Sequence, residues 1–350
     1  MNLEEILNLA GFEALARARL PAEAYSYGAG GAGDEVTLRD NIAAFRRRRL
    51  RPRMLVDVSN VDPSTTMLGG ASALPLGVAP MGRQGWFHPQ AEGAGARAAA
   101  AAGSVFCAST LSNLPLEEIA KAGGLRWLQL YVHKDRSRAE ELVKRAADAG
   151  YEAVVLTVDL PVLGYREREV SASSHFPIGT EIGNFPDMTF DSYDVSSPGT
   201  EHDNSLTWDF LARLRELSAL PLAVKGILTG EDAALAVEHG ASGVVVSNHG
   251  GRQLDRAPAT IDVLEEVVDA VAGRAEVYLD GGVRRGADVL IALALGASGV
   301  LIGRPFLWAL AAAGEAGVTK AFELLKSEIT TDMALLGTPR VADITRAHVQ

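Results

Sequence analysis

The segment SNHGGRQLD (247–255) follows an apolar run and carries a histidine three residues before an arginine. His249 could act as a general base, because imidazole exchanges its proton near neutral pH. Arg252 could bind a substrate carboxylate through paired N–H donors. Asp159, which ends another apolar run, could accept a hydrogen bond from the imidazole and stabilise its protonated form. A structural loop histidine is the alternative, and this segment alone does not decide between the two interpretations.

The elements that must position these residues recur from residue 75 onward as a short apolar strand, a loop and an Ala/Leu-rich helix. Each strand is a continuous apolar run, which is typical of parallel strands buried on both faces. Eight such units in about 230 residues predict a closed (β/α)8 TIM barrel. An open doubly wound sheet is the alternative, but it does not need eight regular repeats. The expected strands cover 76–80, 104–109, 126–131, 153–159, 221–226, 243–248, 276–280 and 299–303.

The remaining segments are expected to extend one barrel domain that comprises the whole chain, 1–350. The N-terminal segment should form helices and then lead into, or close, the bottom of the barrel. The insertion after the fourth strand is long, polar and rich in Gly, Pro, Ser and Asp, which predicts an active-site lid. The expected ranges are 1–74 for the N-terminal helical segment (helices at 3–19 and 35–46), 75–310 for the barrel, 165–205 for the lid and 311–350 for C-terminal helices.

The segment GAGGAG (28–33) formally matches the GxGxxG fingerprint of dinucleotide-binding proteins. That fingerprint must follow a strand and open a helix. Here it follows the helix-like segment LPAEAYSY (20–27), so a glycine-rich linker is predicted in its place.

Polar residues end seven of the eight expected strands, and the active sites of (β/α)8 barrels lie at that end. Solvent exposure does not explain Lys225 and Gln129, because both stand within apolar runs. After the last two strands, LDGGVRRG (279–286) and LIGRP (301–305) place glycine amides and arginines where such barrels commonly bind phosphate. A tight turn with surface arginines is the alternative. The strand-end residues are Ser109, Gln129, Tyr131, Thr157, Asp159, Lys225, Ser247, His249, Asp280 and Arg304.

The composition argues against several classes of function. A formal net charge of −11 disfavours nucleic acid binding. The single cysteine, Cys107, cannot form an intramolecular disulfide, and we expect it to be buried within VFCA. No apolar run reaches about 18 residues and no signal-peptide pattern is visible, so a cytoplasmic protein without a membrane span is expected. No metal-ligand motif is present, and redox chemistry here would need an organic cofactor.

The chain resembles the FMN-dependent L-2-hydroxy acid oxidase/dehydrogenase family, which includes glycolate oxidase and lactate oxidase. The resemblance rests on SNHGGRQLD, LDGGVRRGADV and IGRP. It extends over nearly the whole chain through LPAEAYSYGAGGAGDE, RPRMLVDVSNVD, QLYVHKDR, LTVDLPVLGYRERE, VKGI and LALGASGVLIGRP. It implies an FMN-binding enzyme that oxidises an (S)-2-hydroxy acid, lactate-, mandelate- or longer-chain-like, to the 2-oxo acid, and it suggests a homotetramer.

The resemblance also implies a role for each matching residue. His249 would be the base and Asp159 its orienting carboxylate, while Tyr131 would lie near the substrate hydroxyl and Lys225 beside the N1/O2 edge of the flavin. The implied substrate-binding residues are Tyr27, Gly82, Leu111, Tyr131, Arg166 and Arg252. The implied cofactor-binding residues are Ala79, Pro80, Met81, Ser109, Gln129, Thr157, Lys225, Ser247, Asp280, Gly281, Gly282, Arg284, Gly303 and Arg304.

Two positions depart from the pattern of the glycolate oxidases. Leu111 stands where those enzymes carry a large aromatic residue. Gly82 stands where many oxidases of the family have alanine, whereas dehydrogenase and monooxygenase members often have glycine. We expect the missing methyl group to admit a bulkier α-substituent and to alter the access of O2.

Several functions remain open at this level. The leading prediction is an oxidase that reduces O2 to H2O2. A dehydrogenase that uses a quinone or another acceptor, and a lactate 2-monooxygenase-like oxidative decarboxylation, are the alternatives within the family. Another FMN barrel, such as a type 2 isopentenyl diphosphate isomerase, would not need His249 and Arg252. A phosphate-ligand-binding barrel without catalytic activity is the non-enzyme alternative.

Overall fold

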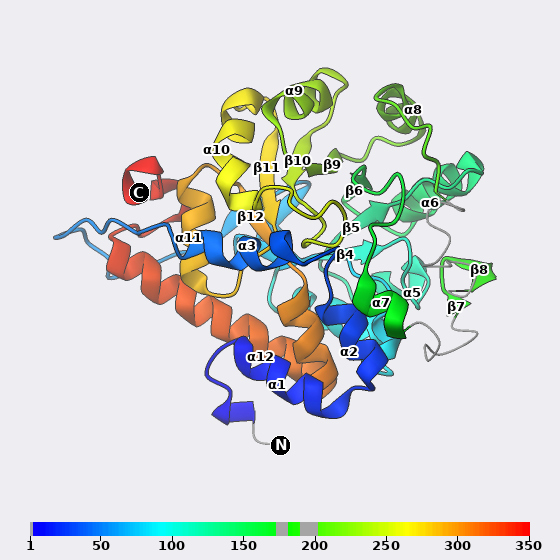
Figure 1. Ribbon diagram of the computed structural model, residues 1–350. Coiled ribbons are helices and arrows are strands. Elements are labelled where there is room, and N and C mark those ends of the chain that lie inside the picture. Colours follow the sequence, from blue (N-terminus) through cyan, green and yellow to red (C-terminus); the bar gives the residue numbers. More distant parts are fainter. Residues whose placement is uncertain (1–2, 173–180, 190–201) are drawn as a thin grey trace.

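A closed barrel of eight parallel strands forms the centre of the computed structural model, which describes residues 3–172, 181–189 and 202–350 (Figure 1). The strands pair around the barrel in chain order, and the last pairs with the first. All eight expected strands are present, so the predicted fold is confirmed. They are β3 (Leu76–Val78), β4 (Val105–Ser109), β5 (Leu125–Leu130), β6 (Ala153–Thr157), β9 (Leu222–Ile227), β10 (Gly243–Val246), β11 (Glu276–Asp280) and β12 (Gly299–Ile302).

Burial on both faces explains why these strands are continuous apolar runs. In β4, Val105 and Cys107 belong to the core inside the barrel, and Phe106 and Ala108 belong to the layer between strands and helices. Alternate residues of a strand point to opposite faces, so each strand needs apolar side chains at successive positions. Cys107 is buried, as predicted.

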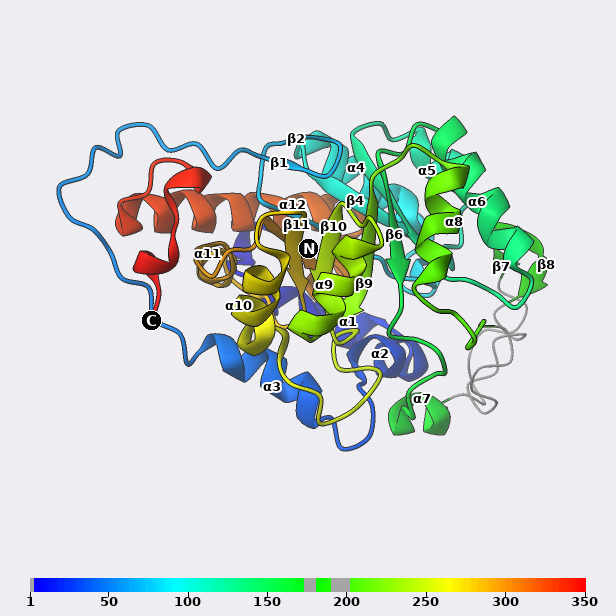
Figure 2. The ribbon, with the colours of Figure 1, turned by 90° about the horizontal axis from the view of Figure 1, so that it is seen from above.

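Helices surround the barrel and supply its outer layer. Figure 2 shows α9 and α10 beside each other. Helix α9 contacts β9 and β10, and α10 contacts β10 and β11. In α6, Ala139, Leu142, Val143 and Ala146 form one buried stripe, which is the spacing of an amphipathic helix. The helices are α4 (Ala91–Ala101), α5 (Leu116–Ala120), α6 (Arg136–Asp148), α8 (Asp209–Leu217), α9 (Gly230–Glu238), α10 (Thr260–Val271), α11 (Gly286–Ala294) and α12 (Arg304–Leu336).

A short antiparallel hairpin closes the amino-terminal end of the barrel. It comprises β1 (Thr65–Met67) and β2 (Gly70–Ser72). Between them, the Leu68 amide donates to the Tyr278 hydroxyl (2.9 Å), and the Trp127 indole N–H donates to the Leu68 carbonyl (3.1 Å). The sequence left open whether this segment leads into the barrel or closes its bottom, and these contacts show that it closes the bottom.

The N-terminal helices η1 (Leu3–Glu5), α1 (Ala10–Arg19), α2 (Ala22–Ala29) and α3 (Val36–Phe45) precede the hairpin, and α1 packs against α12 (Figure 1). The linker prediction for residues 28–33 is wrong at its start, because Gly28 and Ala29 end α2. A Cβ atom at Gly28 would lie 2.6 Å from the Trp308 ring. This glycine therefore serves close helix packing rather than chain flexibility.

The insertion after β6 contains α7 (Glu167–Ala172), β7 (Glu181–Ile182) and β8 (Phe185–Thr189), and α7 contacts α2. The lid predicted over 165–205 lies partly outside the described residues. The short 3-10 helices η2 (Gln84–Trp86), η5 (Val341–Asp343) and η6 (Arg346–His348) complete the described elements. Within the described ranges, no helix is both long and apolar enough to cross a membrane.

Candidate active site

A cavity of about 1310 Å³ opens at the carboxyl end of the barrel. Its lining includes residues that end or follow each of the eight strands, as expected of a (β/α)8 active site. Two predicted site residues, Asp159 and Ser247, lie behind this wall and contact residues that line it. The predicted residues in the lining are Tyr27, Ala79, Pro80, Met81, Gly82, Ser109, Leu111, Gln129, Tyr131, Thr157, Arg166, Lys225, His249, Arg252, Asp280, Gly281, Gly282, Arg284, Gly303 and Arg304.

His249 is held between an acid and a phenol. Its Nδ1 lies 2.8 Å from Asp159 Oδ1, and its Nε2 lies 3.3 Å from the Tyr131 hydroxyl. An ionised Asp159 can only accept, so Nδ1 carries the proton and Nε2 has its lone pair available on the cavity side. Burial, together with the charges of Lys225 and Arg166, holds the pKa of His249 below its ordinary value, although Asp159 opposes that shift. The imidazole is therefore neutral at neutral pH and can accept a proton.

The backbone of the 249–251 turn brings this histidine to the cavity. His249, Gly250 and Gly251 have φ angles of +59°, +64° and +74°, the left-handed region that non-glycine residues seldom adopt. A Cβ atom at Gly250 would lie 2.8 Å from Arg304 Nη1. A side chain there would push the turn away from Arg304, whose guanidinium donates to the Gly250 carbonyl (2.9 Å).

Lys225 lines the cavity and is almost fully buried. Its ammonium group donates to Ser247 Oγ (2.8 Å) and pairs with Asp280 Oδ2 (3.2 Å). Burial opposes the charged form, but Asp280 and Asp159 outweigh it and raise the pKa of Lys225. The hydroxyl of Ser247 also accepts from the His249 amide (3.1 Å), so Ser247 connects the lysine to the histidine turn without lining the cavity.

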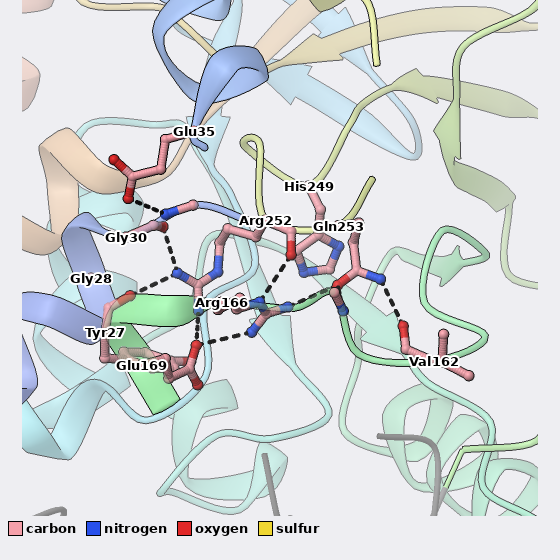
Figure 3. A network of polar contacts seen from close by, with 12 residues as sticks. Tyr27, Gly28, Gly30, Glu35, Val162, Arg166, Glu169, His249, Arg252 and Gln253 are labelled. Carbon is pink, nitrogen blue, oxygen red and sulfur yellow. Dashed lines mark hydrogen bonds and ion pairs between the residues drawn. The ribbon is translucent and has the colours of Figure 1, made fainter. Parts of the chain in front are cut away.

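Arg252 and Arg166 lie together on one side of the cavity (Figure 3). Arg252 Nη1 donates to the carbonyls of Tyr27 (2.7 Å) and Gly30 (3.0 Å), and its guanidinium lies 4.9 Å from the centre of the Tyr27 ring. Arg166 Nε donates to the Arg252 carbonyl (2.9 Å). These bonds fix the orientation of both guanidinium groups and make Arg166 a support for the Arg252 turn.

Arg304 and Arg284 add further buried positive charge to the cavity, and Arg304 shares the Gly30 carbonyl with Arg252. Arg304 donates to three backbone carbonyls, and burial and the charges of Arg252 and Arg284 lower its pKa to about 9. Burial likewise lowers the pKa of Arg284. Charges held so close in a buried site require an anion nearby.

The polar groups of this cavity fit FMN. Arg284 and Arg304 would hold its phosphate, with Gly303, the N-cap of α12, beside them. Asp280 Oδ1 is buried and has no hydrogen-bond partner among the described residues, so it can accept from a ribityl hydroxyl. Gln129 is oriented for a flavin ring, because its oxygen accepts from Ser109 Oγ (3.2 Å) and its amide donates to Thr157 Oγ1 (3.1 Å).

Several residues of the cavity wall were not identified from the sequence. Glu169 is three residues after Arg166, and this spacing could have indicated a helical pair had a helix been predicted there. Arg83 and His202 gave no signal, since neither stands at a strand end. The other unpredicted lining residues are Gly28, Leu160, Leu163, Gly250, Val283, Leu301, Ile302 and Leu307.

Gly82 does not open the cavity in the way the sequence suggested. A Cβ atom there would lie 2.9 Å from the Leu111 carbonyl oxygen and 3.1 Å from Leu111 Cβ. Leu111 therefore occupies the space that a methyl group at position 82 would need. Its carbonyl accepts a hydrogen bond from the Arg83 amide (3.3 Å). The two departures from the glycolate oxidase pattern form one contact.

We expect Gly82→Ala to destabilise the protein by about 1–3 kcal/mol, because the new methyl group must displace the Leu111 backbone. Gly82 does not have a positive φ, so this cost is steric rather than conformational. Urea unfolding of the wild type and the variant measures the difference. A variant as stable as the wild type would show that the Leu111 backbone can move aside without a loss of stability.

The family model described as FMN-dependent dehydrogenase matches residues 16–350 of this chain. A glycolate oxidase of Arabidopsis thaliana is 48% identical over 354 residues, which cover 99% of this chain and 96% of that protein. An L-lactate oxidase of a Nostoc species is 49% identical, with coverage of 97% and 96%.

Solved structures of a mandelate oxidase have the same fold. One has a TM-score of 0.92 and 44% sequence identity, and the match covers 99% of this chain and 98% of that one. A mandelate oxidase variant solved with (S)-mandelic acid has a TM-score of 0.91 at the same identity and coverage.

Proposed function

The chain belongs to the FMN-dependent dehydrogenase family, and we propose that it is an oxidase that converts an (S)-2-hydroxy acid into the 2-oxo acid and reduces O2 to H2O2. The contact of His249 with Asp159, which leaves an unprotonated Nε2 in a cavity that buried arginines also line, is the observation that carries the proposal. The names of the relatives agree with it, since glycolate, lactate and mandelate are all 2-hydroxy acids.

Each of these residues has its own role in the proposed reaction. Arg252 and Tyr27 bind the substrate carboxylate and orient the hydroxyl toward His249. His249 Nε2 removes the hydroxyl proton, and Asp159 stabilises the imidazolium that results. FMN, when bound, accepts the hydrogen and the electron pair that leave the α-carbon. Lys225 supplies a fixed positive charge beside the cofactor, and Arg284 and Arg304 hold the phosphate.

The atoms balance in this scheme. The substrate loses two electrons and two hydrogens, one as the hydroxyl proton on His249 and one with the electron pair from the α-carbon. O2 then takes up both electrons and two protons and leaves as H2O2. We also propose a cytoplasmic location and, from the family resemblance alone, a homotetramer. Light scattering of the purified protein tests the oligomeric state.

We expect the purified protein to be yellow and to lose that colour when mixed anaerobically with its substrate. The panel consists of glycolate, (S)-lactate, (S)-mandelate and longer (S)-2-hydroxy acids, with the (R) enantiomers as controls. Rapid return of colour with H2O2 on admission of air supports the oxidase. Slow return would indicate a dehydrogenase with another acceptor, and a product one carbon shorter would indicate oxidative decarboxylation. A protein that binds no FMN would overturn the proposal entirely.

A further inference from the structure

Glu169 connects the two arginines of the substrate-binding side. It lies in α7, and its side chain is almost fully buried. A single oxygen, Oε2, accepts from Arg166 Nη1 (3.3 Å) and from Arg252 Nη2 (3.2 Å), as Figure 3 shows. Within the described residues, Glu169 is the only carboxylate within ion-pair distance of either guanidinium.

The remaining donors of both arginines hold them in place beside this carboxylate. Arg252 is bound to the carbonyls of Tyr27 and Gly30, and Arg166 donates from Nη2 to Gln253 Oε1 (2.8 Å). Gln253 in turn donates to the Asp159 and Val162 carbonyls. The two guanidinium groups are therefore oriented by neutral groups as well, and Glu169 is not needed as their only anchor.

What Glu169 alone contributes is negative charge. Burial favours its neutral form, but the charges of Arg252, Arg166 and Arg83 outweigh burial and hold the pKa of Glu169 below its ordinary value. Glu169 thus neutralises one of the two guanidinium charges that it contacts, and Arg83 adds a further positive charge nearby. Loss of the Glu169 charge would make this side of the cavity more favourable to a second carboxylate.

Part of the cavity wall beyond these two arginines offers no partner to a second carboxylate, whereas Arg83 and His202 add polar groups elsewhere in the lining. Met81, Leu111, Leu160 and Leu163 line the same cavity and offer no hydrogen-bond donor from their side chains. A second carboxylate on the substrate, if placed near Glu169, would be repelled by its negative charge. Such repulsion is strong in a buried site.

We propose that Glu169 is a specificity-determining residue that restricts the site to 2-hydroxy acids with one carboxylate. It neutralises one of the two guanidinium charges and repels a second carboxylate on the substrate. This inference rests on the proposed function for the identity of the substrate, but it concerns the charge of the ligand and not the chemistry of its oxidation.

The test compares the activity of Glu169→Gln with that of the wild type on two substrates that differ by one carboxylate. Glutamine keeps an oxygen that can accept from both arginines and removes only the charge. We expect the ratio of kcat/KM for (S)-malate to that for (S)-lactate to rise about tenfold or more, corresponding to about 1.4 kcal/mol. The change should lie mainly in the KM of (S)-malate, because the lost repulsion acts on binding.

Two further variants separate charge from structure. Glu169→Asp keeps the charge on a shorter side chain and should retain the wild-type ratio even if its overall activity falls. Glu167→Gln removes one charge from an exposed position of the same helix and controls for general electrostatics. An unchanged ratio in Glu169→Gln, or an equal rise in Glu167→Gln, would overturn the proposal.

A binding measurement keeps this result independent of turnover. Propionate and succinate, a matched pair without a hydroxyl group, are titrated into the FMN-loaded protein, and the flavin absorbance reports the dissociation constants. Glu169→Gln should bind succinate about tenfold more tightly relative to propionate than the wild type does. If no 2-hydroxy acid reduces the flavin of the wild type, the proposed function fails. An unchanged ratio of the succinate and propionate dissociation constants in Glu169→Gln contradicts only the role of Glu169.

Discussion

Replacing His249 with alanine should lower kcat/KM for the 2-hydroxy acid by about 10³–10⁴-fold and leave FMN bound. The imidazole has an acid at Nδ1 and an unprotonated Nε2 on the cavity side, which suits it to accept the hydroxyl proton. The residues assigned to the phosphate, Arg284 and Arg304, are untouched by the change.

Stopped-flow measurement of flavin bleaching under anaerobic conditions gives the rate of the chemical step directly. Because position 249 has a φ of +59°, alanine also adds backbone strain there. His249→Asn controls for this effect, since asparagine adopts the left-handed region more readily. His239→Ala, at the end of α9 and away from the cavity, should bleach at the wild-type rate. Normal bleaching in both His249 variants would remove this residue from the mechanism.

The barrel could be predicted because its strands obey one simple rule. Runs such as AVVLT (153–157) are buried on both faces, so their pattern is continuous and their ends are clear. The N-terminal helix was harder to place, since residues 3–19 are amphipathic but the helix begins only at Ala10. The side chain of Asn8 accepts from the Ala10 amide (3.0 Å), which competes with helical pairing before that point.

From the residues alone, the candidate site was predictable where the topology gathers it, whereas Tyr27 and Arg166, which lie away from the strand ends, were named from the family resemblance. Lys225, His249 and Asp280 end strands, and the barrel alone brings strand ends together. Glu169 comes from the insertion after β6, where no periodic pattern announces a helix. The contact of Gly82 with Leu111 joins two loops, and only the three-dimensional structure shows that a methyl group at Gly82 would meet backbone and not open space.

The partner of the histidine should have the second large effect. Asp159→Asn is expected to lower kcat by about 10²–10³-fold, because the imidazolium formed during catalysis loses the charge that stabilises it. Asparagine can still accept from Nδ1 of His249, so the ring need not move. Burial opposes ionisation of Asp159, but His249, Lys225 and Arg166 hold its pKa below the ordinary value, and the wild-type carboxylate is charged throughout the neutral range.

The same substitution should shift the pH profile in a defined direction. His249 must be neutral to accept a proton, so kcat/KM falls as the pH drops through its pKa. Asp159 raises that pKa, while burial, Lys225 and Arg166 lower it. Removing the Asp159 charge therefore lowers the pKa further, and the acidic limb of the profile moves to lower pH even as the plateau rate falls. Asp148→Asn, at the end of α6, should change neither quantity. An acidic limb that stays in place, or moves to higher pH, in Asp159→Asn would show that His249 is not the group whose titration controls the rate.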